Sequence, residues 1–402
     1  MSEKIKQNKT SKKNSAAYDA VNKVPDYEVS ELAFVSKRTN EYDALIEAIK
    51  KQEMSHYYLY LKTQDPKFPF EESLYQILLK KNEEQIKQLE KDIKEAEKND
   101  EGELEKAYSW VKLGEYYAQI GDVEKSLTTL EKAKKVSISL GGKIDIMLTA
   151  VRIALFFNDQ VAVSEKLNEV HEAIEKGGDW ERRNRFKAYK GIHLMAIRRF
   201  EEASELLVDS LTTFTSLEIA SYEDIAVYSI VCGILSLDRD SLKTKIIDSP
   251  EVLAAMSASE PLQAIFSLAI SLYSSDYGSF FKFLLSTREK VFIPSKFLSP
   301  HTDFFLRQMR LKAYAQLLQS YQSLSLKSMA DSFGVSPEFL DDDLGKFIPT
   351  KQLNCAIDKV NGIVLTNKPE NKDSDFNNLI KQSDTLLSKL QKYVASVKIS
   401  SD

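Results

Sequence analysis

Apolar residues recur with the period of an α-helix along most of the chain. We expect the ordered chain to begin within residues 24–37, and an apolar face over residues 41–60 predicts a helix that ends near Pro66. A charged helix follows over residues 73–98 with one narrow apolar stripe, Leu79, Ile86, Leu89, Ile93 and Ala96. We expect the stripe to pack along another helix of this chain, although a partly exposed arm would show the same pattern.

Residues 110–138 carry the signature of a tetratricopeptide repeat, which is a pair of antiparallel helices. Trp110, Leu113, Gly114 and Tyr117 fit the pattern W-x-x-L-G-x-x-Y, and Gly121 falls at the expected turn between the helices. The second helix should contribute Ser126, Leu130 and Ala133 to the contact, because small residues let two helices approach and a large residue fills the gap.

A looser copy of this repeat begins near residue 187. Gly191 and Leu194 take the positions of Gly114 and Tyr117, and Ala203, Leu207 and Ser210 take those of Ser126, Leu130 and Ala133. Further helical segments are expected over residues 144–174, 220–237, 262–273 and 277–285. Because a single pair cannot bury its apolar face, the pairs should stack as an α-solenoid with an extended concave surface for proteins or peptides.

The pattern near the C-terminus predicts a helix, a tight turn and a second helix. Leu326, Met329, Ala330 and Phe333 share one helical face, and Gly334 is a suitable C-cap. Ser336 and Pro337 then fit the N-cap and the first position of the next helix, which has a second apolar face at Phe339, Leu340 and Leu344.

After Pro349 the period changes from helical to that of a β-strand. Leu353, Cys355 and Ile357 alternate with more polar positions, and Asn361-Gly362 is a strong hairpin signal before a second strand over residues 363–366. A helix-turn-helix followed by a β-hairpin is a winged helix. A helix over residues 304–321 should lead into this module.

The last predicted helix covers residues 375–398 and has an unusually regular apolar stripe. Such a stripe is typical of a helix that joins a bundle with other chains, although it could instead fold back on its own solenoid. The stripe consists of Phe376, Leu379, Ser383, Leu386, Leu390, Tyr393 and Val397, and is widened by Ile380, Leu387 and Val394.

Composition favours a helical globular protein, because 43% of the 402 residues are hydrophobic and only 13 Gly and 10 Pro interrupt them. We divide the chain into a tail expected to be disordered (1–20), a helical region with the long charged helix (21–100), the repeat array (101–300), the winged helix (301–370) and the C-terminal helix (371–402). The N-terminus has no signal-peptide core, and the longest apolar run, residues 225–237, is too short to cross a bilayer.

The charges argue against a nucleic-acid-binding winged helix. The second helix carries Glu338, Asp341, Asp342 and Asp343 against a single Lys346, and the formal net charge of the chain is −5. In a DNA groove this helix would meet phosphates of like charge. The remaining function of a winged helix is to bind another protein.

No catalytic or metal-binding pattern emerges from the sequence. His56, His171, His193 and His301 have no histidine neighbour at metal-ligand spacing, and no phosphate-binding loop or nucleophile motif is present. Gly177-Gly178-Asp179 precedes an arginine-rich helix start, where a helix end, a turn and an N-cap explain the glycines better than a phosphate site. The arginines should pair with acidic residues of neighbouring repeats or of a partner. Cys232 and Cys355 should be buried free thiols. We therefore predict no enzyme activity, no cofactor and no metal site.

Repeats that lead into a winged helix and a terminal helix form the architecture of the PCI family. Several strings, among them EGELEKAYSWVKLGEYYAQIGD, GGDWERRNRFKAYKGIH and LGKFIPTKQLNCAIDKVNGIVLTNKPENK, are specific. From about Val24 to its C-terminus the chain resembles PCI subunits of the proteasome regulatory-particle lid. This resemblance implies a non-catalytic scaffold in lid assembly and ubiquitin-dependent protein degradation, located in cytoplasm and nucleus. The related scaffold of the COP9 signalosome and, less well supported, a winged-helix nucleic-acid-binding protein are the alternatives.

The resemblance also implies two contact regions and several partners. Winged helices of such subunits pack side by side, and their C-terminal helices gather in one bundle. The implied partners are other PCI subunits, the lid deubiquitinase module, a small acidic lid protein and the ATPase ring, with no nucleic acid and no membrane. Carried onto this chain, the winged-helix edge comprises Phe333, Val360, Asn361, Gly362, Ile363 and Leu365. The bundle contacts comprise Phe376, Leu379, Leu386, Leu390, Tyr393 and Val397.

Overall fold

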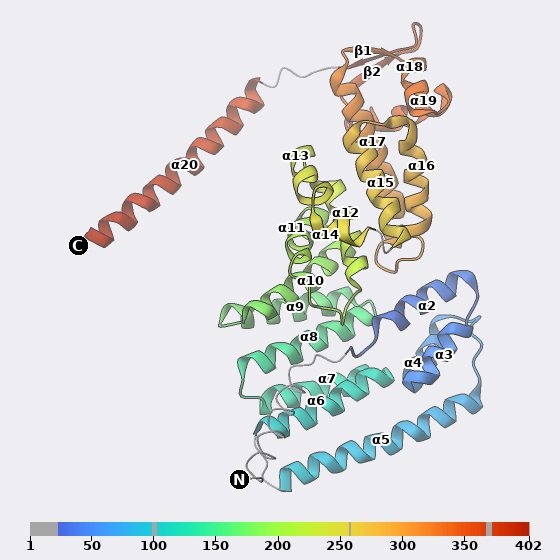
Figure 1. Cartoon of the computed structure of the whole chain (residues 1–402), viewed down its shortest axis with the longest axis vertical. Coiled ribbons are helices and arrows are strands. Elements are labelled where there is room, and N and C mark those ends of the chain that lie inside the picture. The colour runs from blue at the N-terminus through green and yellow to red at the C-terminus, as the bar shows by residue number, and fades with distance from the viewer. Residues whose placement is uncertain (1–22, 99–102, 257–258, 367–371, 402) are drawn as a thin grey trace. The chain divides into compact units, whose positions relative to one another are not determined.

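The computed structural model describes residues 23–98, 103–256, 259–366 and 372–401. The chain divides into two compact units, Met1–Met309 and Arg310–Asp402. The first unit is helical, and the second contains the one sheet found among the described residues (Figure 1). The tail over residues 1–20, predicted to be disordered, lies outside the described residues.

Four helices open the first unit: α2 (Tyr27–Thr39), α3 (Asp43–Gln52), α4 (Ser55–Gln64) and α5 (Glu72–Lys98). The single helix predicted over residues 41–60 is wrong, because Glu53 takes a left-handed conformation (φ 56°) that ends α3. The long charged helix is confirmed as α5, which packs against α6 and α4 of the same chain. Of its predicted stripe, Ile93 and Ala96 are buried, and Leu79, Ile86 and Leu89 are half-buried. Its most buried polar residue is Asn82, which donates to Ser55 Oγ (2.6 Å) and accepts from the Tyr116 hydroxyl (3.3 Å).

The helices that follow form the predicted array of antiparallel pairs, in which each helix packs mainly on its neighbours in the chain. The array confirms the predicted α-solenoid. The apolar run over residues 225–237 lies almost entirely in a buried helix, as expected. The helices are α6 (Glu103–Ile120), α7 (Val123–Val136), α8 (Leu140–Phe156), α9 (Gln160–Glu175), α10 (Trp180–Ala196), α11 (Phe200–Leu211), α12 (Tyr222–Ser236), α13 (Arg239–Leu242), α14 (Pro250–Ala255), α15 (Glu260–Ser274) and α16 (Tyr277–Thr287). Short π-helices at Lys243–Ile247 and Arg288–Phe292 and a 3₁₀ turn at Ser299–His301 complete the path to α17 (Thr302–Ser320).

The two repeat copies share the same close helix–helix contact. A Cβ atom on Gly114 of α6 would lie 2.8 Å from Leu130 Cδ2 of α7, and one on Gly191 of α10 would lie 2.7 Å from Leu207 Cδ2 of α11. In the first copy, the buried Ser126 hydroxyl also donates to the Gly114 carbonyl oxygen at 2.8 Å. These contacts confirm the roles assigned to the small and large repeat positions.

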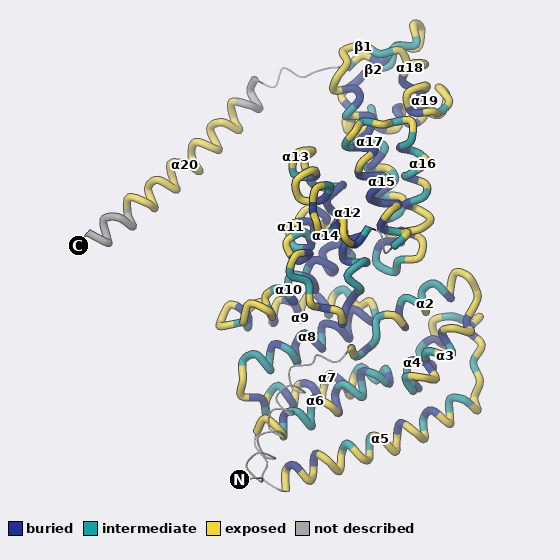
Figure 2. The backbone as a smooth tube through the Cα atoms, viewed as in Figure 1, coloured by how far each residue is buried: buried dark blue, intermediate teal, exposed yellow. Residues whose placement is uncertain are grey.

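The winged helix of the second unit is built by β1 (Ser323–Ser325), α18 (Leu326–Phe333), α19 (Pro337–Phe347), β2 (Cys355–Asp358) and β3 (Ile363–Thr366). All strands are antiparallel in the order β1-β3-β2, so β3 is central. The interior of this unit includes the buried side chains of Met329, Phe333, Leu340, Leu344 and Phe347. Figure 2 shows buried stretches of backbone along α18 and α19. The sequence pattern did not predict β1, which is only three residues long.

The chain ends in α20 (Lys372–Ser401), which confirms the predicted C-terminal helix with slightly wider bounds. Both cysteines are free and buried, as predicted, and burial raises the pKa of each thiol. Within the described residues, no helix is both long enough and apolar enough to span a bilayer.

Candidate interaction surfaces

A buried charge cluster fixes the acidic helix α19 inside the winged-helix unit. Asp343 is 1% exposed and accepts hydrogen bonds from Arg310 Nη1 at 3.0 Å and from the Tyr314 hydroxyl at 3.2 Å. The sequence pattern grouped Asp343 with Glu338, Asp341 and Asp342 as acidic residues that would face a DNA groove, which is wrong for Asp343 because its side chain is buried. Its place between Leu340 and Phe347, on their helical face, was the signal that could have revealed its burial.

The wing is a β-hairpin whose loop covers residues 359–362. Asp358 shapes this loop by accepting hydrogen bonds from the backbone N–H groups of Val360 and Asn361 and from Asn361 Nδ2. These bonds lower the pKa of the Asp358 carboxyl group. Gly362 has φ 64°, a conformation that glycine adopts without the steric cost of a side chain. The loop therefore holds the Val360 side chain in solvent, where it is 93% exposed.

The six residues expected at the winged-helix edge do not all reach the surface. Val360, Asn361 and Leu365 are exposed, Gly362 and Ile363 are half-buried, and Phe333 is 1% exposed. Phe333 packs edge-on against Tyr314, with ring centroids 5.1 Å apart, so it stabilises the interior of the module.

The outward face of the sheet adds residues that sequence reasoning did not identify. Leu365 on the central strand lies opposite Ser323 of β1 and Ala356 of β2, and all three are exposed. This row gives a small, weakly polar surface beside the wing. It was not predicted because β1 was not predicted, and without β1 the central position of β3 was unknown.

The exposed charge on α19 is acidic, as the sequence indicated. Glu338 and Asp342 are exposed, and Asp341 Oδ2 accepts a hydrogen bond from Lys359 Nζ of the wing at 2.9 Å. This helix therefore presents little positive charge to a phosphate backbone.

The apolar stripe of α20 is open to solvent in this chain. Every side chain described on it, from Phe376 to Val394, is classed as exposed, and Figure 2 draws the helix accordingly. The exposed fractions include 64% for Phe376, 62% for Leu379, 60% for Leu386, 54% for Leu390 and 66% for Tyr393. The Val397 side chain lies outside the described residues.

In the first unit, Arg182 and Arg185 bind acidic residues of neighbouring parts of the array, as predicted, whereas Arg183 donates to the Gly178 carbonyl oxygen. Arg182 donates to Asp145 of α8 at 2.6 Å. Arg185 is 5% exposed and bonds both Asp145 (3.2 Å) and the buried Glu218 (3.2 Å), which also accepts from the Tyr189 hydroxyl. The cluster ties together α8, α10 and the segment that precedes α12.

The four histidines lie apart and make separate contacts. His193 and His301 are buried, and burial lowers the pKa of each. His56 and His171 lie near single carboxylates, Asp122 and Glu175. Over the described ranges, no group of three His, Cys, Asp or Glu side chains is placed to hold a metal ion.

Comparison with known proteins bears directly on this architecture. Residues 71–245 match the family model described as 26S proteasome subunit RPN7, and residues 276–368 match the PCI domain. The chain is 53% identical to the 26S proteasome regulatory subunit RPN7 of Saccharomyces cerevisiae, across 94% of this chain and 95% of that protein. The chain belongs to the RPN7 family.

Other relatives of the RPN7 family are similar over nearly the same length. The regulatory subunit rpn7 of Schizosaccharomyces pombe is 40% identical over 92% of this chain, and the 26S proteasome non-ATPase regulatory subunit 6 of Dictyostelium discoideum is 35% identical over 93%. The match to the PCI domain includes the winged-helix module described above. The resemblance noted from the sequence strings is thereby confirmed.

Proposed function

We propose that this chain is a non-catalytic scaffold of the proteasome regulatory-particle lid that supports lid assembly and ubiquitin-dependent protein degradation. The names of its relatives support a place among the 26S proteasome regulatory subunits. Its partners would be other PCI subunits, the deubiquitinase module, a small acidic lid protein and the ATPase ring. It would act in the cytoplasm and nucleus, and the five-part division of the chain remains our proposal for its domains.

The exposed stripe of α20 is the observation that carries this proposal. Leu379, Leu386 and Leu390 each expose more than half of their surface. Burial of one such leucine side chain against a partner stabilises the complex by on the order of 2 kcal/mol. The stripe therefore favours a helical bundle with other chains, in which α20 would bury this row.

The wing and the row around Leu365 would form the second contact. Val360 projects from a loop that Asp358 holds in place, so it could insert into a neighbouring winged helix without rearrangement of this module. The acidic surface of α19 weighs against a DNA-binding use of the same fold.

The experiment expresses two variants of the chain in cells, one with added charge on the leucine face of α20 and one with the same charge on the opposite face. Leu386→Asp with Leu390→Asp should lower incorporation into the regulatory particle at least tenfold, measured by affinity purification and native mass spectrometry. The control, Thr385→Asp with Ser388→Asp, adds the same charges on the opposite face and should assemble normally. Deletion of residues 375–402 should leave a folded chain that does not assemble.

Normal assembly of the leucine variant or of the deletion would refute the bundle. Co-purification with a cullin-directed isopeptidase instead of the peptidase core would point to the signalosome. Salt-sensitive DNA binding by the purified chain would support the nucleic-acid alternative.

A further inference from the structure

Helix α19 has an exposed face that is unfavourable in several ways for a helix surrounded by water. Glu338, Asp342 and Gly345 follow one another at intervals of four and then three residues, so they share one side of the helix, and Phe339 lies beside them. All four residues are exposed, whereas the apolar residues of the opposite side are buried. We call these four residues the α19 face.

The glycine of the α19 face has no structural reason within the described part of this chain. The φ angle of Gly345 lies outside the left-handed region, and a Cβ atom there would meet no described atom within 4 Å apart from its own helix. Glycine also weakens a helix relative to alanine. In the two repeats, Gly114 and Gly191 each let a neighbouring helix approach closely. Gly345 therefore indicates a similar approach by a helix from outside this chain.

The other side chains of the α19 face indicate the kind of partner. Glu338 suits the first turn of α19, but Asp342 places a second carboxylate one turn later on the same side, and like charges at this spacing repel. Lys346 is the only basic residue in α19, and its ammonium group lies 4.0 Å from the buried Asp343. Phe339 exposes 42% of its surface beside the two carboxylates. A basic surface with an apolar patch would complement this face.

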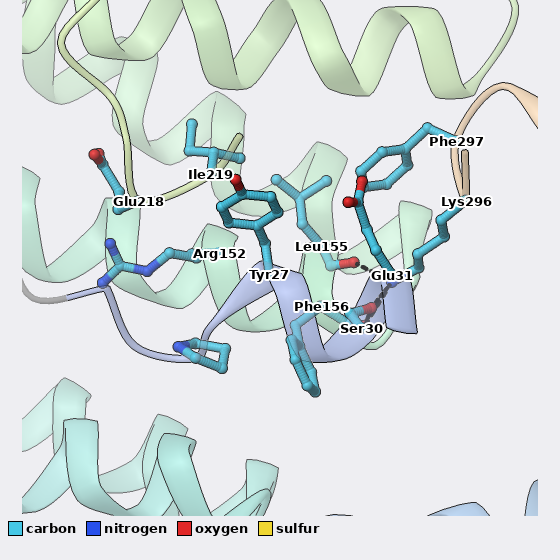
Figure 3. Close-up of a pocket in the computed structure, with 11 residues that line it drawn as sticks. Tyr27, Ser30, Glu31, Arg152, Leu155, Phe156, Glu218, Ile219, Lys296 and Phe297 are labelled. Atoms are coloured by element: carbon cyan, nitrogen blue, oxygen red, sulfur yellow. Dashed lines mark hydrogen bonds between the residues drawn. The ribbon is translucent and has the colours of Figure 1, made fainter. Parts of the chain in front are cut away.

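Unusual polar residues of the first unit, in contrast, are explained by contacts within the chain. Lys296 is half-buried, and its Nζ donates to Ser30 Oγ (2.5 Å) and to two carbonyl oxygens at the end of α8 (2.7 and 3.2 Å). Figure 3 shows its side chain reaching these acceptors. Arg38 of α2 donates to the Ile293 carbonyl oxygen (3.0 Å) and to Ser299 Oγ. Both cations are thus bound inside the unit, so neither calls for a partner.

We propose that the α19 face binds a basic helix of another subunit in the regulatory particle. The backbone of that helix crosses α19 at Gly345, and its lysine or arginine side chains reach Glu338 and Asp342, whose mutual repulsion they relieve. An apolar side chain of the same helix covers Phe339. This inference rests on the proposed function, because the partner is a subunit of the same assembly.

The variant Gly345→Ala separates stability from binding, because the two should change in opposite directions. In the purified chain the new methyl group enters solvent and favours the helix, so the melting temperature should rise by about 2 °C. In cells that make the variant in place of the natural chain, incorporation into the regulatory particle should fall several-fold, because the methyl group meets the partner helix. Gly278→Ala, at another exposed glycine within a helix, should be incorporated normally.

Charge reversal tests whether the partner is basic. Glu338→Lys with Asp342→Lys should lower incorporation about tenfold, because like charges would then face each other across the contact. The neutral pair Glu338→Gln with Asp342→Asn should give an intermediate loss. Glu83→Lys with Glu84→Lys makes the same change in net charge at exposed positions of α5 and should leave incorporation unchanged.

Three results would contradict these expectations in different ways. Incorporation of Gly345→Ala or of the double lysine variant at the level of the natural chain would overturn the inference. A lower melting temperature of purified Gly345→Ala would also overturn it, because the glycine would then have a role inside the chain. A natural chain that does not enter the regulatory particle would instead refute the proposed function.

Discussion

Tyr314 and Asp343 are joined in the interior of the winged-helix unit, where the phenol donates a 3.2 Å hydrogen bond to the carboxylate. Arg310 donates to the other carboxylate oxygen at 3.0 Å. Burial, followed by the charge of Asp343, raises the pKa of the Tyr314 hydroxyl group. The carboxylate thus receives two donors from α17 and holds α19 against it.

Replacement of Asp343 should strongly destabilise this unit. Asp343→Ala removes the buried acceptor that both Arg310 and Tyr314 use, at a cost of about 1–3 kcal/mol in the free energy of unfolding. Asp343→Asn keeps one oxygen acceptor and should cost less. Urea unfolding of the purified chain measures both, with exposed Asp342→Asn as the control; equal stability of Asp343→Ala and the control would contradict this account.

The glycines of the two repeats should not tolerate a methyl group. Gly114→Ala and Gly191→Ala each place Cβ within 3 Å of a buried leucine, and overpacking of this kind costs about 1–3 kcal/mol. Gly278→Ala is the control in the same unit, because its new Cβ would meet only Asp276 Oδ1, at 3.7 Å. Thermal unfolding should give lower melting temperatures for Gly114→Ala and Gly191→Ala than for Gly278→Ala. A melting temperature of Gly114→Ala equal to that of Gly278→Ala would disprove the close contact.

Removal of one partner of the buried pair Arg185–Glu218 should lower the free energy of unfolding more than replacement of both partners by apolar residues. Arg185→Ala removes the guanidinium that pairs with the buried Glu218 carboxylate and leaves the Tyr189 hydroxyl as a hydrogen-bond donor to it, which we expect to cost about 3–5 kcal/mol in the free energy of unfolding. The double variant Arg185→Met/Glu218→Met removes both charges and should recover most of the loss. Arg183→Ala, at an exposed neighbouring position, is the control for denaturant unfolding. A double variant no more stable than Arg185→Ala would argue against a desolvation penalty.

The wing offers a test that separates folding from assembly. Val360→Asp should change the free energy of unfolding by less than about 0.5 kcal/mol, because the side chain is already in solvent. It should nevertheless reduce incorporation into the regulatory particle several-fold in a pull-down from cells. Asn354→Asp adds a charge at another exposed position of the module and should assemble normally. Wild-type incorporation of Val360→Asp would exclude the wing from the contact.

Most of the fold was predictable because local signals and the buried faces agree. The repeat glycines, the cap at Gly334 and the hairpin at Asn361-Gly362 each require a particular backbone or spacing, and each lies where it was expected. The break at Glu53 was not visible, because no glycine or proline marks it. Strand β1 was missed because three residues are too few to show a period of two.

The candidate surfaces were harder to predict than the fold. Apolar periodicity identifies a helical face but does not tell a core face from a partner face, which is why Phe333 was expected at an edge and lies in the interior. Asp343 was misjudged because its partners, Arg310 and Tyr314, belong to a distant part of the sequence. The bonds of α2 to residues 293–299 have no sequence signal at all, since they join opposite ends of the first unit.

The two sheltered thiols make this chain convenient for spectroscopy. Cys232 is completely buried and Cys355 nearly so, and burial shifts both toward the unreactive protonated form. A maleimide dye should therefore not label either native cysteine in the folded protein. A single new cysteine at position 360 or on α20 could then report by fluorescence when each surface meets a partner, with the natural cysteines left in place.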